Sequence, residues 1–197
     1  TGNPIVIKCS PYTPLPLLYF AQLAAQAKIP AGFFSVVLSD IAESESLVKS
    51  EVFKLLSFTG GHTTGWHLKN IAGKKRVLLE LGGNAPVILD EDTDCAAAAK
   101  ALAPAAFLYA GQICIKTQRI IVHQKIYAEF CDFFKVETEN ILKAKVGDPS
   151  LEQTLVGPLI HHSQLKRIQQ WVGEAVTAGA KLLLGGKIID EPRNIFS

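Results

Sequence analysis

Short apolar runs alternate with longer amphipathic segments along the first part of the chain. Residues 5–7 are apolar and β-branched, and residues 33–38, 53–58 and 76–81 are further apolar runs of strand length. Between them the pattern favours helices at about residues 14–28, 43–49 and 64–71, the first with Thr13 as N-cap and Pro14 at the first helical position. The sequence therefore predicts the order βαβαβαβ.

The same alternation continues through the rest of the chain. Residues 86–89, 120–123 and 181–184 are predicted as strands, residues 94–109, 125–143 and 163–178 as helices, and residues 147–158 as a loop. This order favours right-handed crossovers and a parallel sheet covered on both faces, with ligands at the carboxyl ends of the strands. We place a boundary at Gly82-Gly83, which predicts one α/β unit over residues 1–82 and a second over residues 83–197.

Composition and charge narrow the class of protein. The chain has 197 residues, of which 48% are hydrophobic and 19% charged, with a net charge of +2; these values are typical of a folded α/β protein. No dense run of Lys and Arg interleaved with aromatic residues is present, so nucleic acid is not an expected partner. The apolar run at residues 15–25 is too short to span a membrane. We expect a cytoplasmic protein without a membrane partner.

The cysteines, the histidines and the chain ends add further expectations. The four cysteines lie far apart, whereas disulfide frameworks are dense and zinc sites need close pairs. The five histidines form no HxH or HxxxH arrangement, so no metal site is predicted. The chain begins with Thr1, contains no Met and stops at Ser197 without a capped element. We expect it to be an internal piece of a longer protein.

Cys114 is the candidate nucleophile. It ends the sequence Gly111-Gln112-Ile113-Cys114, between an Ala-rich helix and the next strand, in a loop whose amides can point at a bound oxygen. A thiolate adds readily to a carbonyl carbon when its pKa is lowered or a base stands near. For an arbitrary free cysteine, a buried structural position is the commoner explanation.

Glu80 is the candidate general base. It lies in an otherwise apolar strand end and is followed by Leu81, Gly82 and Gly83. Burial would raise the pKa of a carboxyl group toward the working range of a base, and glycines let a ligand approach the backbone. A structural glutamate that is hydrogen-bonded or faces solvent is the alternative. The presence of a candidate nucleophile favours the base.

Two further segments are candidates for binding a phosphate or a ribose. Residues 60–65 (GGHTTG) follow a strand and open a helix, so their amides could bind a phosphate. They match neither GxGxxG nor a P-loop, and a bare turn is the commoner explanation. Lys8, at the carboxyl end of the first strand, could reach a ribose or phosphate, although a lone surface lysine is usually solvated.

Taken together, these segments resemble the aldehyde dehydrogenase superfamily through nearly the whole chain. Residues 8–14 (KCSPYTP) resemble its lysine-containing cofactor segment, and residues 58–65 its pyrophosphate turn, FTG-x-x-x-x-G. Residues 80–83 resemble the ELGG motif of its catalytic glutamate and residues 111–114 the GQxC motif of its cysteine, 34 positions after Glu80 (114 minus 80). The resemblance implies part of a Rossmann-like parallel-sheet cofactor domain followed by part of an α/β catalytic domain.

The resemblance also implies a role for each candidate residue. The family oxidises aldehydes to carboxylic acids with NAD or NADP, so Cys114 would form a thiohemiacetal and then a thioester, and Glu80 would assist hydrolysis. Relatives that pass the acyl group to coenzyme A typically lack this glutamate, which favours acid formation. A small aldehyde would be the substrate, and the full-length chain would form a homo-oligomer, a dimer or a tetramer. The residues implied in cofactor binding are Lys8, Gly60, Gly61, Gly65, Leu81 and Gly82.

Departures from the family pattern leave alternatives open. Gly61 replaces the usual Ser of the turn, and Pro11 stands where many NAD-preferring members have a glutamate, so NAD and NADP both remain candidates. The asparagine that completes the oxyanion hole and the later glutamate-phenylalanine motif are expected outside residues 1–197. Two alternatives to an oxidoreductase follow. One is a non-catalytic family member that serves as a binding or structural module, and the other is a thioester or ester hydrolase that uses Cys114 without a dinucleotide.

Overall fold

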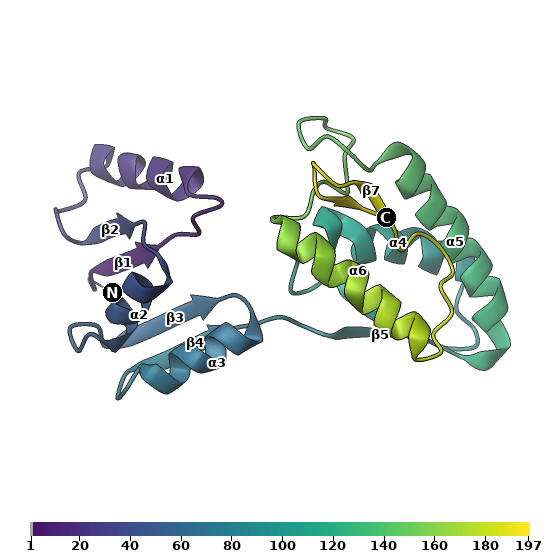
Figure 1. Ribbon diagram of the computed structural model, residues 1–197, viewed down its shortest axis with the longest axis horizontal. Helices are drawn as coiled ribbons and strands as arrows, with labels where there is room; N and C mark the ends of the chain where they lie inside the picture. Colours follow the sequence, from purple (N-terminus) through teal and green to yellow (C-terminus); the bar gives the residue numbers. More distant parts are fainter. Residues whose placement is uncertain (1) are drawn as a thin grey trace. The chain divides into compact units, whose positions relative to one another are not determined.

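The chain divides into two units between Leu81 and Gly82, one residue before the predicted boundary. A computed structural model describes residues 2–197, and Figure 1 traces the elements of each unit. Helices alternate with strands through most of the chain, and three of the four strand pairs among the described residues are parallel, in agreement with the predicted α/β class. The two units are called unit 1 and unit 2 in chain order.

Unit 1 has the predicted order of strands and helices. Its elements are β1 (Ile5–Lys8), α1 (Leu15–Gln26), β2 (Phe34–Val37), α2 (Ile41–Lys49), β3 (Leu55–Thr59), α3 (His62–Ile71) and β4 (Arg76–Glu80). β1 pairs with β2 and β3 pairs with β4, in parallel in both cases. Within the described residues no ladder joins the two pairs, so the strands form two two-stranded sheets where a single sheet was predicted.

The helix starts in unit 1 differ from the predicted ones by one or two residues. α2 begins at Ile41 because Asp40 and Glu43 form a capping box, in which each side chain accepts from the other's backbone N–H, at 2.7 and 3.1 Å. α1 begins at Leu15 with Pro14, not Thr13, as its N-cap. α3 begins at His62, before the predicted start at residue 64.

The largest core cluster of unit 1 is small and lies between α2, α3 and the β3–β4 pair. Val48, Leu68 and Ala72 are buried there, and Val77 of β4 packs against them. Side chains along β4 alternate between half-buried and exposed, as strand geometry requires. Leu78 is on the outer face and is 58% exposed. The predicted covering of both sheet faces is therefore absent at β4.

Unit 2 is built around a βαβ motif. Its elements are β5 (Ala85–Leu89), α4 (Cys95–Phe107), η1 (Leu108–Gly111), β6 (Thr117–Val122), η2 (Gln124–Ile126), α5 (Tyr127–Ala144), α6 (His162–Thr177), β7 (Ile188–Asp190) and β8 (Ile195–Phe196). β5 and β6 pair in parallel, and α4 connects them. Leu89, Ala99 and Phe130 belong to the core cluster that joins this pair to α4 and α5.

β6 carries one extra residue relative to β5. Ala85 is paired with Thr117 and Pro86 with Arg119, so Gln118 has no partner of its own and forms a bulge. Pro86 lacks the N–H that a regular ladder would require, and such irregular points are where a strand tolerates proline. Past the bulge, β6 continues in regular pairing with β5.

The predicted strand at residues 181–184 is wrong. Leu182 and Leu183 are exposed, and within the described part of the chain no strand pairs with this segment. An apolar run supplies a preference for strand, but a strand forms only with a ladder partner. Instead, β7 and β8 form a short antiparallel pair. Asp190 supports the turn between them by accepting hydrogen bonds from the backbone and guanidinium N–H groups of Arg193, at 3.0 and 2.7 Å.

Candidate active site

The Cys114 loop, defined as residues 108–116, joins α4 to β6 through a strained backbone. α4 ends at Phe107, before the predicted end at Tyr109. Tyr109, Ala110 and Gly111 have φ angles of 52°, 56° and 69°. A non-glycine residue in this left-handed region costs roughly 1–2 kcal/mol, and residues strained in this way cluster at functional sites. Cys114 comes after Gln112 and Ile113 and is exposed.

The backbone N–H of Cys114 donates to no acceptor among residues 2–197. Two other N–H groups of the loop are paired: the Gln112 N–H donates to the Tyr109 carbonyl at 3.2 Å, and the Lys116 N–H to the Ile113 carbonyl at 3.3 Å. A free N–H beside an exposed thiol is able to donate to an oxygen on the carbon that the sulfur attacks. The loop therefore carries a nucleophile and a donor for an oxyanion.

The Gln112 side chain connects the loop to a distant segment. Its Nε2 donates to the carbonyls of Tyr109 and Pro158, at 3.0 and 3.4 Å, and its Oε1 accepts from the Ile160 N–H at 2.9 Å. These contacts could not be predicted from the local sequence, because Pro158 and Ile160 lie 46 and 48 positions away from Gln112. Its place in the GQxC motif was the only signal.

The other three cysteines have less accessible thiols. Cys9 is 2% exposed and Cys95 is 4% exposed, and burial raises the pKa of the Cys95 thiol. Cys131 is half-buried, and its hydrogen bond with Tyr127 raises the pKa of that phenol. All four cysteines lie in the described part of the chain, and Cys114 alone is exposed. Its environment favours a reactive thiol over a buried structural cysteine.

Lys116 lies two positions after Cys114 and has a half-buried side chain. Desolvation lowers the pKa of its ammonium group. Its side chain packs on Gly111, since a Cβ built on Gly111 would lie 3.2 Å from the Lys116 Cδ. Lys116 also lines a cavity of about 360 Å³ together with aromatic side chains that include Phe107, Phe130 and Phe134. Cys114 does not line this cavity.

Glu80 ends β4 and is exposed, with no side-chain partner among residues 2–197. It lies opposite Thr59 at the end of β3, and its carbonyl accepts from the Gly60 N–H at 3.0 Å. The expected burial is absent, because the alternation along β4 puts Glu80 on the same uncovered face as Leu78. The carboxylate is free and stands at the carboxyl end of a parallel strand pair.

The glycine turn, residues 60–65, has part of the predicted anion-binding geometry. The Gly60 N–H is not free, because it donates to Glu80. The amides of residues 62–64 are the first of α3, where a helix provides no acceptor for them, and no side chain caps the helix. A Cβ built on Gly61 would meet nothing within 4 Å. The open helix start therefore suits a phosphate.

Gly65 and Leu81, two of the predicted cofactor residues, contact each other. A Cβ built on Gly65 would lie 2.4 Å from the Leu81 Cδ2, and one built on Gly60 would lie 2.6 Å from the ring of Phe58. Glycine at these positions lets the turn pack closely on the two strands. The two glycines thus have a packing role in addition to any contact with a ligand.

Lys8 and Gly82 are the remaining predicted cofactor residues. Lys8 is exposed at the end of β1, opposite Val37 of β2. Gly82 begins unit 2, and a Cβ built on it would meet nothing within 4 Å. At the end of the β3–β4 pair, contacts bring together Gly60, Gly65, Glu80 and Leu81.

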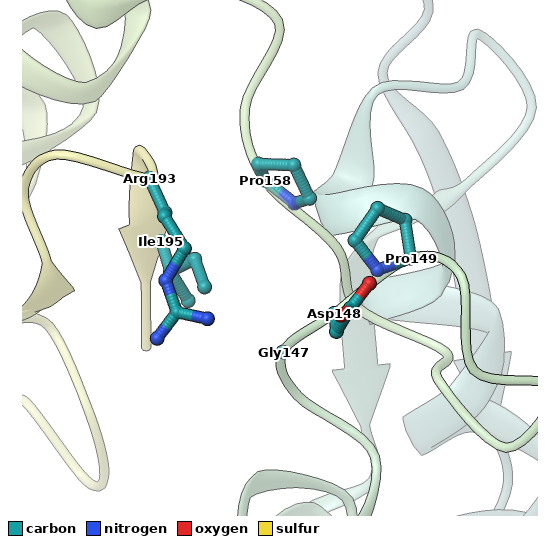
Figure 2. Close-up of a pocket in the computed structure, with 6 residues that line it drawn as sticks. All are labelled: Gly147, Asp148, Pro149, Pro158, Arg193 and Ile195. Atoms are coloured by element: carbon teal, nitrogen blue, oxygen red, sulfur yellow. The ribbon is translucent and has the colours of Figure 1, made fainter.

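A further cavity, of about 280 Å³, lies in unit 2 beside the loop that follows α5. Figure 2 shows Arg193 and Ile195 on one side of it and Asp148, Pro149 and Pro158 on the other. No predicted site residue lines it. Within residues 2–197 there is also no group of three His, Cys, Asp or Glu side chains placed to hold a metal ion, and no helix with the length and hydropathy needed to cross a membrane.

Comparison with known proteins identifies the family. A sequence model described as the aldehyde dehydrogenase family matches residues 1–196. The 3-sulfolactaldehyde dehydrogenase of Priestia aryabhattai is 40% identical over 187 residues, which cover 94% of this chain and 39% of that protein. This chain belongs to the aldehyde dehydrogenase family, and it spans about 39% of the length of that relative.

Solved structures of similar fold include proteins with a bound dinucleotide. Lactaldehyde dehydrogenase from Escherichia coli has a TM-score of 0.91 at 32% identity, over 100% of this chain and 42% of its own. Aldehyde dehydrogenase C from Pseudomonas syringae, complexed with NAD⁺ and octanal, has a TM-score of 0.90 at 32% identity, over 98% and 40%. Glyceraldehyde-3-phosphate dehydrogenase from Methanocaldococcus jannaschii, complexed with NADP, has a TM-score of 0.90 at 33% identity, over 100% and 43%. The predicted fold is confirmed.

Proposed function

We propose that the full-length protein oxidises an aldehyde to a carboxylic acid with NAD or NADP, and that Cys114 is its nucleophile. The observation that carries this proposal is the exposed Cys114 thiol beside its own unpaired N–H, in a chain of the aldehyde dehydrogenase family. Unit 1 would bind the dinucleotide, and unit 2 would carry the nucleophile. A homo-oligomer, a dimer or a tetramer, is the assembly we propose for the full-length chain.

The first half of the reaction takes place at Cys114. The thiolate attacks the carbonyl carbon, so that a C–S bond forms and the carbonyl oxygen becomes an oxyanion of the thiohemiacetal. The Cys114 N–H donates to this oxyanion, which stabilises the charge where it develops. When bound, the dinucleotide supplies the acceptor for the hydride, and the carbon left on Cys114 is then at the oxidation level of a thioester.

The second half of the reaction requires a base for water. Glu80 has a carboxylate with no side-chain partner among residues 2–197, so it is available to take a proton. We propose that it accepts a proton from the water that attacks the thioester carbon. The C–S bond then breaks with its electron pair going to sulfur, the acid leaves, and the thiolate of Cys114 is regenerated.

The dinucleotide would be held by the residues that the family resemblance implies. The uncapped amides at the start of α3 suit its pyrophosphate, and the open backbone at Gly61 leaves room for it. Lys8 is exposed at a strand end and would contact the ribose or a phosphate. Gly60, Gly65, Leu81 and Gly82 would shape the surface around it.

Similar proteins are named for chemically different substrates. Those reported above act on 3-sulfolactaldehyde, lactaldehyde or glyceraldehyde 3-phosphate, or were solved with octanal. These compounds differ in charge and length and share the aldehyde group. We therefore propose a small aldehyde as the substrate.

The proposal is tested with the full-length protein, a panel of small aldehydes, and NAD and NADP separately. Reduction of the dinucleotide is expected, and Cys114→Ala should abolish it. Glu80→Gln should lower turnover by about 10²–10⁴-fold, the usual effect of losing a general base, with the loss at thioester hydrolysis. No reduction by the folded wild type with any aldehyde would contradict the oxidoreductase and favour a binding module. Ester hydrolysis at a rate that does not depend on added dinucleotide would favour the thioester or ester hydrolase.

A further inference from the structure

The start of the Cys114 loop is fixed by a residue that no step of the proposed reaction uses. The Gln112 carboxamide bonds to the Tyr109 carbonyl within the loop and to Pro158 and Ile160 outside it. The Tyr109 N–H adds a bond to the same distant segment, donating to the Leu155 carbonyl at 3.0 Å. Residues 155–160 therefore hold the loop on one side.

The segment before β5 contacts the loop at a second point. A Cβ built on Gly83 would lie 2.3 Å from the carbonyl oxygen of Cys114 and 3.4 Å from its carbonyl carbon. These are backbone atoms, which cannot rotate away as the end of a flexible side chain can. The Arg119 guanidinium donates to the Asn84 carbonyl at 3.2 Å, and Ala85 pairs with Thr117. Only glycine at position 83 allows this approach without a shift of the backbone.

The loop depends on these contacts because of its backbone conformation. Tyr109 and Ala110 have positive φ angles, which non-glycine residues rarely adopt. Such conformations persist only where surrounding contacts hold them. If the contacts were lost, the turn would relax. The thiol and the N–H of Cys114, which are attached to the same Cα, would then change direction together.

We propose that Gln112 and Gly83 are positioning residues that set the direction of the Cys114 thiol and N–H toward a bound carbonyl group. This inference rests on the proposed role of Cys114 as the nucleophile. Gln112 acts through the hydrogen bonds that fix the left-handed turn. Gly83 acts through the absence of a side chain, which lets its segment close against the Cys114 carbonyl.

Three variants of the full-length protein separate these contributions. Gln112→Ala removes all three hydrogen bonds, whereas Gln112→Glu keeps the length and the acceptor for Ile160 but loses both donors. Gly83→Ala introduces the clash with Cys114. Gln118→Ala is a matched control, because Gln118 is exposed and its side chain has no partner among residues 2–197. Gly173→Ala is the matched control for Gly83→Ala, because a Cβ built on Gly173 would meet nothing within 4 Å.

Two rates are measured for each variant: turnover, resolved into kcat and the KM of each substrate, and alkylation of Cys114 by iodoacetamide without dinucleotide. We expect all three variants to lower kcat by about 10²-fold, the effect of displacing a reacting group by roughly 1 Å. The KM for dinucleotide should stay within about two-fold, because its binding residues are untouched. Alkylation should slow in the three variants and match the wild type in both controls.

Unchanged kcat and unchanged alkylation in folded Gln112→Glu and Gly83→Ala would overturn the proposal. Circular dichroism identifies a variant that fails to fold, and if Gly83→Ala does so, the isosteric Gln112→Glu decides. A wild type that reduces no dinucleotide would contradict the proposed function alone. In that case the rate of Cys114 alkylation still tests the positioning role of Gln112 and Gly83. Slower labelling in the variants supports this role, and equal labelling overturns it.

Discussion

The reactivity of a cysteine depends on how readily its thiolate forms and on how readily a reagent reaches it. The four thiols of this chain differ in how accessible they are. Cys114 is exposed on a loop, whereas Cys95 is almost completely buried and its thiol pKa is raised by that burial. The order of their reactivity therefore follows from local environment rather than from position in the sequence.

We expect iodoacetamide to label Cys114 first in the native full-length protein. Cys95 is buried and its thiol pKa is raised by that burial, so its labelling should be slower than that of the exposed Cys114 and should accelerate as the pH rises. Mass spectrometry of peptides after timed labelling at several pH values measures the order. The denatured protein, in which all four should react alike, is the control. Labelling of Cys95 as early as Cys114 in the native protein would contradict the assignment.

At the residue scale, the sequence predicted where the candidate residues lie along the elements better than it predicted their burial and their contacts. The motifs placed Cys114 on a loop and Glu80 at a strand end, and both locations are observed. The expected burial of Glu80 failed, because burial depends on which elements cover a strand face, and local sequence does not contain that information. The contacts of Gln112 were missed for the same reason, since they join segments far apart in the chain.

At the element scale, the capping box of α2 gives a measurable prediction. Asp40→Ala removes the acceptor for the Glu43 N–H and should destabilise the start of α2 by about 1 kcal/mol. Hydrogen exchange of the α2 amides should then accelerate by roughly 5-fold, the factor that corresponds to this free energy. Glu51→Ala is the control, because the Glu51 carboxylate has no partner among residues 2–197. Equal exchange in the two variants would show that the cap does not stabilise α2.

Elements that have a local sequence signal were predicted. Elements that form only by pairing with another strand were not. The β-branched run at residues 5–7 became β1, and Asp94 caps α4 through its bond from the Ala97 N–H at 3.0 Å. The apolar run at residues 181–184 has the same local appearance but no ladder partner among the described residues. β7 and β8 were missed because strands as short as three and two residues carry almost no periodicity.

At the scale of the whole molecule, many large apolar side chains lie on the surface. Leu15 of α1 is 74% exposed and Ile88 of β5 is 75% exposed, and Tyr19, Phe20 and Leu23 are also exposed on α1. Each two-stranded sheet also has unpaired strand edges. Exposed apolar surface and free edges both favour association with another chain.

We therefore expect the 197-residue chain by itself to associate. Sedimentation velocity over a range of concentrations measures this, and the sedimentation coefficient should rise with concentration. Leu15→Lys and Ile88→Lys should reduce the association by placing a charge on the apolar surface, whereas Lys74→Arg, an exposed substitution that conserves charge, should not. A coefficient that is independent of concentration and typical of a monomer would contradict the expectation.

The bulge at Gln118 determines which side chains of β6 face the core of unit 2 after the chain leaves the Cys114 loop. Ile120 and Val122 pack against the core only because the extra residue restores the alternation of side chains after the irregular pairing at Pro86. Deletion of one residue between Cys114 and Ile120 would either turn these side chains outward or draw the loop along the strand by about 3.3 Å, the rise of one residue. The number of residues between the loop and the strand is therefore fixed. This segment tolerates substitution, but a change of a single residue in its length would move either the nucleophile or the core.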